Sequence, residues 1–123
     1  MIIGIGCDLA EVNRIYKALG LKGFAARVFT EREQAYCNGR GVQAYQSFAA
    51  RFAAKEAFLK AIGTGLRDGR LTEIEVTNDD LGRPQLVLHG YFKNYAASLG
   101  VKCMHLTLSH TKDLAMAQVI LEV

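Results

Sequence analysis

The chain has 123 residues, which suits one compact domain and leaves little room for two. Hydrophobic residues make up 50% of it and proline occurs once, which excludes a disordered or low-complexity chain. The net charge of +3 is too small to indicate nucleic-acid binding, and no apolar run is long enough to cross a bilayer. We therefore expect a single domain over residues 1–123, in a cytoplasmic protein that binds neither nucleic acid nor a membrane.

The first predicted element is a strand over residues 2–8. Its apolar side chains share one face, and the other face carries Gly4, Gly6 and Asp8. Because glycine has no side chain, that face lets another element approach the strand closely. We expect Asp8 to end the strand, so that its carboxylate projects beside bare backbone.

Helices dominate the next part of the chain. One is predicted from Glu11 to Leu19, where Gly20 ends it, and another begins at Thr30 with the pattern of a capping box. The strongest helical pattern runs over residues 43–62. Its apolar stripe, which we expect to face the core, consists of Tyr45, Phe48, Ala49, Phe52 and Leu59.

The second half of the chain alternates strands, turns and one helix. Turn-forming residues at 78–84 join two short strands and so predict a hairpin. A helix and two last strands follow, with a turn at 111–113. The predicted strands are 73–77, 85–88, 104–109 and 115–121, and the helix is 91–99. Since this order does not alternate strand and helix regularly, the fold class is α+β.

Two carboxylates could carry chemistry. Asp8 either caps the following helix or projects toward a ligand. Glu56 lies about 40° from Phe52 around the long helix, inside the apolar stripe, where an unpaired charge is costly. It either pairs with Lys60 one turn later or binds a metal. Mg²⁺ is the ion that fits, because it typically takes one or two carboxylates together with substrate phosphates.

Several basic and polar residues could bind phosphate. Around Glu56 lie Arg51, Lys55 and Lys60, which either hold phosphate oxygens or form a solvated helix face. Neighbouring side chains on a strand point to opposite faces, so Ser109 and His110 cannot form a nucleophile and base pair. They could contact a phosphate together with Thr111, or simply form a turn. Four basic residues without any acid among them predict an acidic partner; they are Arg14, Lys17, Lys22 and Arg27.

These features occur in an order that resembles the holo-(acyl-carrier-protein) synthases, the small bacterial class of 4′-phosphopantetheinyl transferases. Two signatures carry the resemblance together, namely Gly6-Cys7-Asp8 and Phe52-Ala53-Ala54-Lys55-Glu56-Ala57-Phe58-Leu59-Lys60. The likeness extends from the first strand to the last through Phe29-Thr30-Glu31-Arg32-Glu33, Gly63-Thr64-Gly65 and Leu108-Ser109-His110-Thr111. Cys7 stands where the family has Ile, Val or Thr, which are similar in size.

The resemblance implies a small antiparallel sheet packed by a long helix, in a homotrimer with active sites between subunits. It implies a magnesium-dependent enzyme of fatty acid biosynthesis. This enzyme would transfer the 4′-phosphopantetheine group of coenzyme A to a serine of apo acyl carrier protein and release adenosine 3′,5′-bisphosphate.

The resemblance also implies roles for single residues. Asp8 and Glu56 match the magnesium ligands, and Lys60 matches a lysine near the coenzyme A phosphates; these three are the implied catalytic residues. Further coenzyme A contacts are implied for Arg51, Thr64, Gly82, Arg83, Pro84, Ser109, His110 and Thr111. The acidic carrier protein would dock on the basic stretch with Arg14, Lys17, Lys22 and Arg27.

Two other functions stay open on the sequence. A magnesium-dependent hydrolase of nucleotide pyrophosphates would use the same carboxylates without a protein acceptor. A non-catalytic basic module for an acidic protein or RNA would depend on Arg14 and Arg27 and dispense with Asp8 and Glu56. The base that deprotonates the attacking serine also stays open between Glu56, another carboxylate and a metal-bound water.

Overall fold

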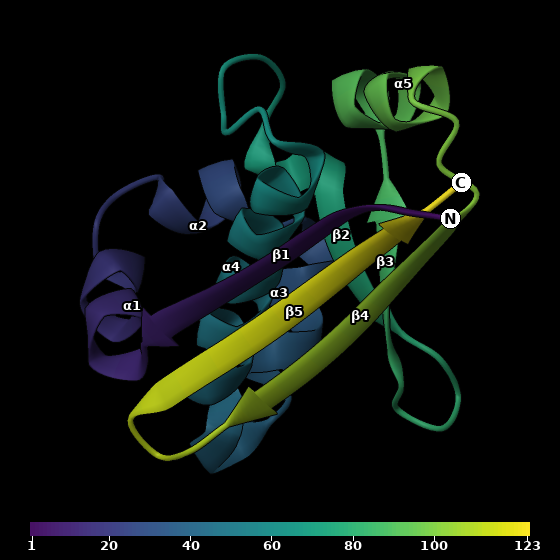
Figure 1. The fold of residues 1–123 in the computed structure, drawn as a ribbon. Coiled ribbons are helices and arrows are strands. Elements are labelled where there is room, and N and C mark those ends of the chain that lie inside the picture. Colours follow the sequence, from purple (N-terminus) through teal and green to yellow (C-terminus); the bar gives the residue numbers. More distant parts are fainter.

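The computed structural model describes all of residues 1–123 and has the predicted α+β class (Figure 1). A three-stranded antiparallel sheet has the order β1–β5–β4, from β1 (Ile2–Glu11), β5 (Leu114–Glu122) and β4 (Cys103–His110). The long helix α4 (Ala44–Ile62) packs against one face of this sheet. A separate antiparallel hairpin consists of β2 (Ile74–Asn78) and β3 (Pro84–Leu88).

Four shorter helices surround this frame. They are α1 (Val12–Leu19), α2 (Phe24–Val28), α3 (Glu31–Asn38) and α5 (Gly90–Ser98). Single 3₁₀ turns at Gly41–Gln43 and Leu71–Glu73 precede α4 and β2. The predicted helices and the hairpin are confirmed with small differences at their ends, whereas α2 was not predicted. It starts at Gly23, which is in a left-handed conformation, and no Ser, Thr, Asp or Asn side chain caps it.

The glycine face of β1 packs directly on α4, as expected. A Cβ atom at Gly4 would overlap the carbonyl oxygen of Ala61, and one at Gly6 would overlap that of Ala57. The prediction that Asp8 ends the strand is wrong. Pairing with β5 continues to Glu11, opposite Leu114, because the β4–β5 hairpin extends beyond Asp8.

The helix α4 is buried over more of its circumference than the predicted stripe. Phe48, Ala49 and Leu59 are buried as expected, but Phe52 is only partly buried and Tyr45 is exposed. Tyr45 instead packs edge-on against Tyr16 of α1, with ring centroids 4.7 Å apart. The sheet, α1, α3 and the hairpin all touch α4, so small alanines on several sides are covered as well.

The capping box at the start of α3 is confirmed. The Thr30 hydroxyl accepts the Glu33 backbone N–H at 3.2 Å, and the Glu33 carboxylate accepts the Thr30 N–H at 2.9 Å. This arrangement fixes Glu33 at the first turn of the helix, where its carboxylate faces the core.

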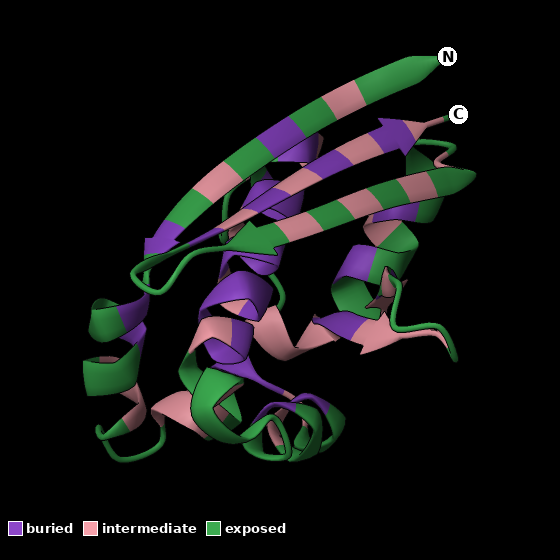
Figure 2. Cartoon of the chain, turned by 90° about the horizontal axis from the view of Figure 1, so that it is seen from below, coloured by how far each residue is buried: buried purple, intermediate pink, exposed green.

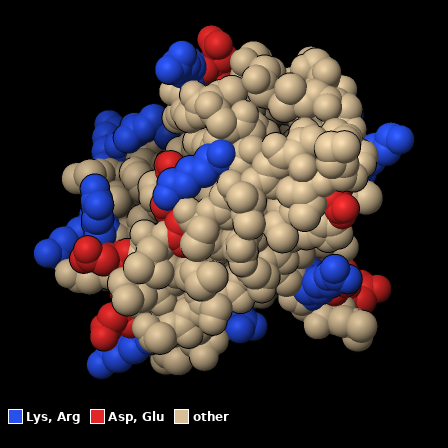
Figure 3. Space-filling view, in the orientation of Figure 1, with Lys and Arg blue, Asp and Glu red and all other residues tan.

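The three-stranded sheet has one covered face and one open face. From Ile3 to Glu11, exposed residues of β1 alternate with buried or partly buried ones (Figure 2), and the exposed set includes Ile5 at 60% and Leu9 at 63% exposure. Figure 3 shows this outer face nearly free of charged side chains. No helix of the chain is long and apolar enough to span a membrane.

Candidate active site

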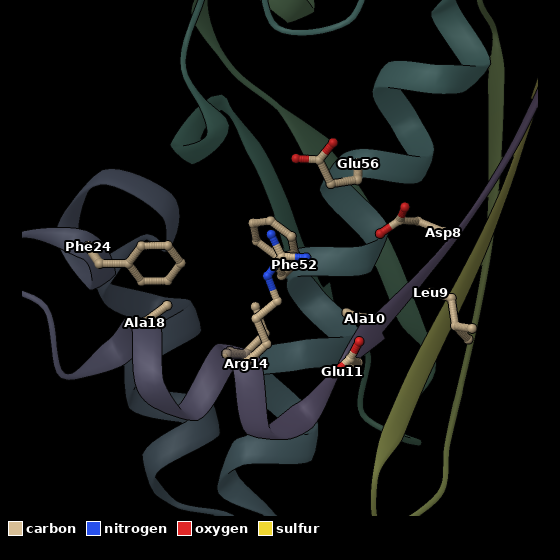
Figure 4. Close-up of a pocket in the computed structure, with 10 residues that line it drawn as sticks. Asp8, Leu9, Ala10, Glu11, Arg14, Ala18, Phe24, Phe52 and Glu56 are labelled. Atoms are coloured by element: carbon tan, nitrogen blue, oxygen red, sulfur yellow. The ribbon is translucent and has the colours of Figure 1, made fainter.

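Asp8 of β1 and Glu56 of α4 lie in the wall of one pocket of about 390 Å³. Both carboxylates point into the space between α4 and the α1–α2 region (Figure 4). The close contact of the glycine face with α4 brings together these two residues, which are far apart in the sequence. The structure therefore unites the two carboxylates that the sequence singled out.

Lys60 completes this arrangement one turn after Glu56. Its ammonium donates to the Asp8 carboxylate at 3.1 Å and to the Cys7 carbonyl oxygen at 2.9 Å. The Lys60 side chain is 57% exposed, so it remains accessible to a ligand. Two alternatives considered on the sequence are wrong: Glu11 and not Asp8 precedes α1, and Lys60 bonds Asp8 rather than Glu56.

The electrostatics of Glu56 favour a bound cation. Burial, and then the negative charge of Asp8, raise the pKa of the Glu56 carboxyl above its usual value, while Lys60 opposes the shift. No group of three or more His, Cys, Asp and Glu side chains is arranged to hold a metal. A pair of carboxylates facing an open pocket suits Mg²⁺, which keeps several waters and takes substrate phosphates as further ligands. Asp8 and Glu56 are thus the residues that could hold it.

The remaining wall of the pocket is basic and apolar. Arg14 of α1 reaches into it toward Phe52, and Phe24 of α2 lies opposite (Figure 4). The sequence indicated Arg14 only as part of the basic stretch and predicted Phe52 to lie in the core. It made no prediction for Phe24. Phe24 reaches the pocket from α2, which has no clear sequence signal, and Phe52 reaches it from a partly covered side of α4.

The other members of the basic stretch lie on the surface. Lys17, Lys22 and Arg27 are exposed on α1, α2 and the turn between them. Figure 3 shows Lys and Arg side chains gathered along this edge of the molecule. The basic stretch thus borders the pocket that contains the two carboxylates.

Lys55 does not serve as an accessible cation beside Glu56, which corrects the expectation from the sequence. Its side chain is fully buried and forms an ion pair with Glu33 at 2.8 Å. It also donates to the carbonyl oxygens of Leu71 at 3.0 Å and Ile74 at 2.6 Å. All three ammonium donors therefore have acceptors within the chain, so Lys55 has a structural role.

Arg51 lies in a second pocket of about 300 Å³, between α3, α4 and β2. It is only 3% exposed, and its guanidinium stacks on the Tyr36 ring at 4.1 Å and donates to Asn78. Its Nε–H is buried without a hydrogen-bond partner. A guanidinium that lines a pocket and has no carboxylate partner is suited to bind an anion.

The other expected coenzyme A contacts lie outside the pocket of Asp8 and Glu56. Thr64 follows α4, where its hydroxyl donates to the Gly65 carbonyl at 2.9 Å. The Thr111 hydroxyl accepts the Leu114 N–H at 3.1 Å in the β4–β5 turn, which Ser109 and His110 precede. The turn with Gly82, Arg83 and Pro84 lies across the molecule from α1 (Figure 1). A single chain therefore does not bring these groups together with the two carboxylates.

Nearly the whole chain matches one family of known proteins. The family profile described as the 4′-phosphopantetheinyl transferase superfamily matches residues 4–120. The holo-(acyl-carrier-protein) synthase of Solibacter usitatus is 50% identical over 125 residues, which cover 99% of each chain.

Solved structures give the same result. The crystal structure of the Bacillus anthracis holo-(acyl-carrier-protein) synthase, in complex with CoA (3′,5′-ADP), is 41% identical with a TM-score of 0.81, over 98% of this chain and 96% of that one. The Neisseria meningitidis holo-(acyl-carrier-protein) synthase is 32% identical with a TM-score of 0.90, over the full length of both chains.

Proposed function

The chain belongs to the 4′-phosphopantetheinyl transferase superfamily, and on this premise we propose that it is a holo-(acyl-carrier-protein) synthase. It transfers the 4′-phosphopantetheine group of coenzyme A to a serine of apo acyl carrier protein. The observation that carries the proposal is the meeting of Asp8, Glu56 and Lys60 at one pocket. Residues 1–123 form one transferase domain, and the cytoplasmic location expected from the sequence stays a prediction.

The chemistry requires charge neutralisation and positioning more than covalent catalysis. The serine hydroxyl gives its proton to a base, and its oxygen bonds to the β-phosphorus. The bond from that phosphorus to the bridging oxygen breaks, and adenosine 3′,5′-bisphosphate leaves. Asp8 and Glu56 would hold Mg²⁺, which supplies Lewis acidity at the pyrophosphate. The exposed Lys60 ammonium gives up its contact with Asp8 and neutralises phosphate charge beside the two carboxylates.

The basic stretch is the proposed docking surface for the carrier protein. Arg14 reaches into the pocket, and Lys17, Lys22 and Arg27 extend positive charge along the neighbouring surface. Because complementary charge speeds the encounter of two proteins, an acidic carrier would be guided toward the pocket. Its serine would then face the two carboxylates.

We also infer a homotrimer with active sites between subunits. The open face of the sheet exposes Ile3, Ile5 and Leu9, an apolar surface that a second copy of the chain would cover. Arg51 and His110 lie away from the pocket of Asp8 within one chain. A neighbouring subunit could supply them, together with the turn around Arg83, to the same coenzyme A molecule.

The decisive experiment is the intact mass of an apo acyl carrier protein after incubation with this protein, coenzyme A and Mg²⁺. A gain of one phosphopantetheine group that EDTA abolishes supports both the transfer and its metal dependence. Consumption of coenzyme A without any gain would favour the hydrolase, and unchanged coenzyme A with several carriers would favour the binding module.

A further inference from the structure

Asn78, at the end of β2, links two parts of the molecule that the family resemblance associates with coenzyme A. Its side-chain oxygen accepts a hydrogen bond from the Arg51 guanidinium, and its side-chain nitrogen donates to the Gly82 carbonyl at 3.0 Å. Arginine has only donors and a carbonyl only accepts, so a single orientation of the amide satisfies both contacts. The carboxamide therefore joins Arg51 on α4 to the β2–β3 turn.

The rest of the turn is held by Asp79. Its carboxylate accepts the backbone N–H groups of Leu81 at 2.9 Å and Arg83 at 2.8 Å. These bonds fix the conformation of the turn but not its position relative to α4. Among the side-chain hydrogen bonds, only that of Asn78 to Arg51 connects the turn to the helix.

Arg51 has few other contacts that orient it. Its guanidinium lies over the Tyr36 ring, a contact that sets no hydrogen-bond direction, and its Nε–H has no partner. The bond to Asn78 fixes the guanidinium in one orientation, where Arg51 lines the pocket between α3, α4 and β2. An anion would meet donors that are already oriented, which lowers the entropic cost of binding.

We propose that Asn78 is a positioning residue for the nucleotide part of coenzyme A, because it fixes the Arg51 guanidinium and the turn around Gly82 relative to each other. This inference rests on the proposed function, since both groups act on coenzyme A only if the chain is such a transferase. Asn78 itself need not touch the nucleotide. The sequence indicated only a turn residue at this position.

The test compares Asn78→Ala with Gln85→Ala, which also removes a carboxamide. Gln85 is exposed on the neighbouring strand, opposite Thr77, and its side chain makes no hydrogen bond. Binding of adenosine 3′,5′-bisphosphate, measured by titration calorimetry, should weaken about tenfold in Asn78→Ala, since the charged hydrogen bond from Arg51 is lost. It should stay unchanged in Gln85→Ala. The KM for coenzyme A should rise by the same factor, while the KM for the carrier protein and kcat stay close to wild type.

Asn78→Asp provides a second variant that protects the test against misfolding. Its carboxylate still accepts from Arg51 but cannot donate to Gly82, and it neutralises the guanidinium, so bisphosphate binding should again weaken with an unchanged Tm. Wild-type affinity in both Asn78 variants, or equal rises in the two KM values, would overturn the inference. If the wild-type protein binds the bisphosphate but does not modify the carrier, the proposed function is overturned. The comparison of bisphosphate binding between the variants still decides the role of Asn78 in that case.

Discussion

Gly6 of β1 lies so close to Ala57 of α4 that a Cβ atom on Gly6 would overlap the Ala57 carbonyl oxygen. Asp8 is two residues beyond Gly6 on the same face of the strand, and Glu56 directly precedes Ala57 on the helix. The separation of strand and helix at this contact therefore sets the separation of the two carboxylates. Glycine is the only residue that permits it without a shift of the backbone.

The Gly6→Ala variant tests this relationship. We expect the free energy of unfolding to fall by about 1–3 kcal/mol, because the added methyl group must displace β1 from α4. Transfer activity should fall further than the remaining folded fraction explains, since the two carboxylates move apart. Urea denaturation with a parallel activity assay measures both effects.

Gly39→Ala is the matched control for this substitution. Gly39 has a helical φ of −78°, and a Cβ atom there would make only ordinary contacts. Its stability should stay near that of the wild type. Equal stability of the two variants would contradict the proposed role of the glycine face.

Much of this arrangement could be predicted from the sequence because local patterns determine it. The alternation along β1 identified the glycine face, and the order Thr30 to Glu33 identified the capping box that the structure contains. Contacts between distant segments could not be predicted. Lys55 and Glu33 lie 22 residues apart and pair only in the folded core. Asn78 stands among turn residues in the sequence, and only the fold brings it to Arg51.

Glu56→Gln should abolish detectable transfer while the protein stays folded, with a Tm no lower than that of the wild type. The amide removes the charge that would hold Mg²⁺, and loss of one electrostatic group at such a site typically lowers kcat by about 10²–10³. Glu31→Gln, at an exposed position on α3, is the control and should behave as wild type. A wild-type rate of Glu56→Gln in saturating Mg²⁺ would remove Glu56 from the metal site.

The pKa of Glu56 also predicts a pH dependence of stability. Burial and the Asp8 charge hold this pKa above the ordinary value of 4.5 in the folded protein. Between the ordinary and the raised pKa, the folded state binds more protons than the unfolded chain, so the free energy of unfolding falls as pH rises. In metal-free buffer, Glu56→Gln should therefore gain stability relative to wild type as the pH rises from about 4.5 through the raised pKa. Denaturation curves at several pH values measure the difference, and a constant difference would contradict the shifted pKa.

The buried pair of Lys55 and Glu33 predicts a large loss of stability when one partner is removed. Lys55→Met should lower the free energy of unfolding by about 3–5 kcal/mol, because it leaves the Glu33 carboxylate buried without its cation. The double variant Lys55→Met/Glu33→Gln should recover part of that loss, since no charge stays unpaired. If the losses of stability in Lys55→Met and in Glu33→Gln simply added up in the double variant, the two residues would not interact.

Arg14 differs from the rest of the basic stretch because it lines the pocket of Asp8 and Glu56 while it also borders the proposed docking surface. Arg14→Glu should raise the KM for the carrier protein about tenfold, since charge steering of an acidic partner is reversed at the point where its serine must enter. The KM for coenzyme A should change far less.

Lys93→Glu is the control, because Lys93 is exposed on α5, on the other side of the molecule from α1 (Figure 1). Added salt should reduce the difference between wild type and Arg14→Glu, because ions screen exposed charges. If the two KM values rise equally, Arg14 acts on the pocket itself and not on the docking of the carrier.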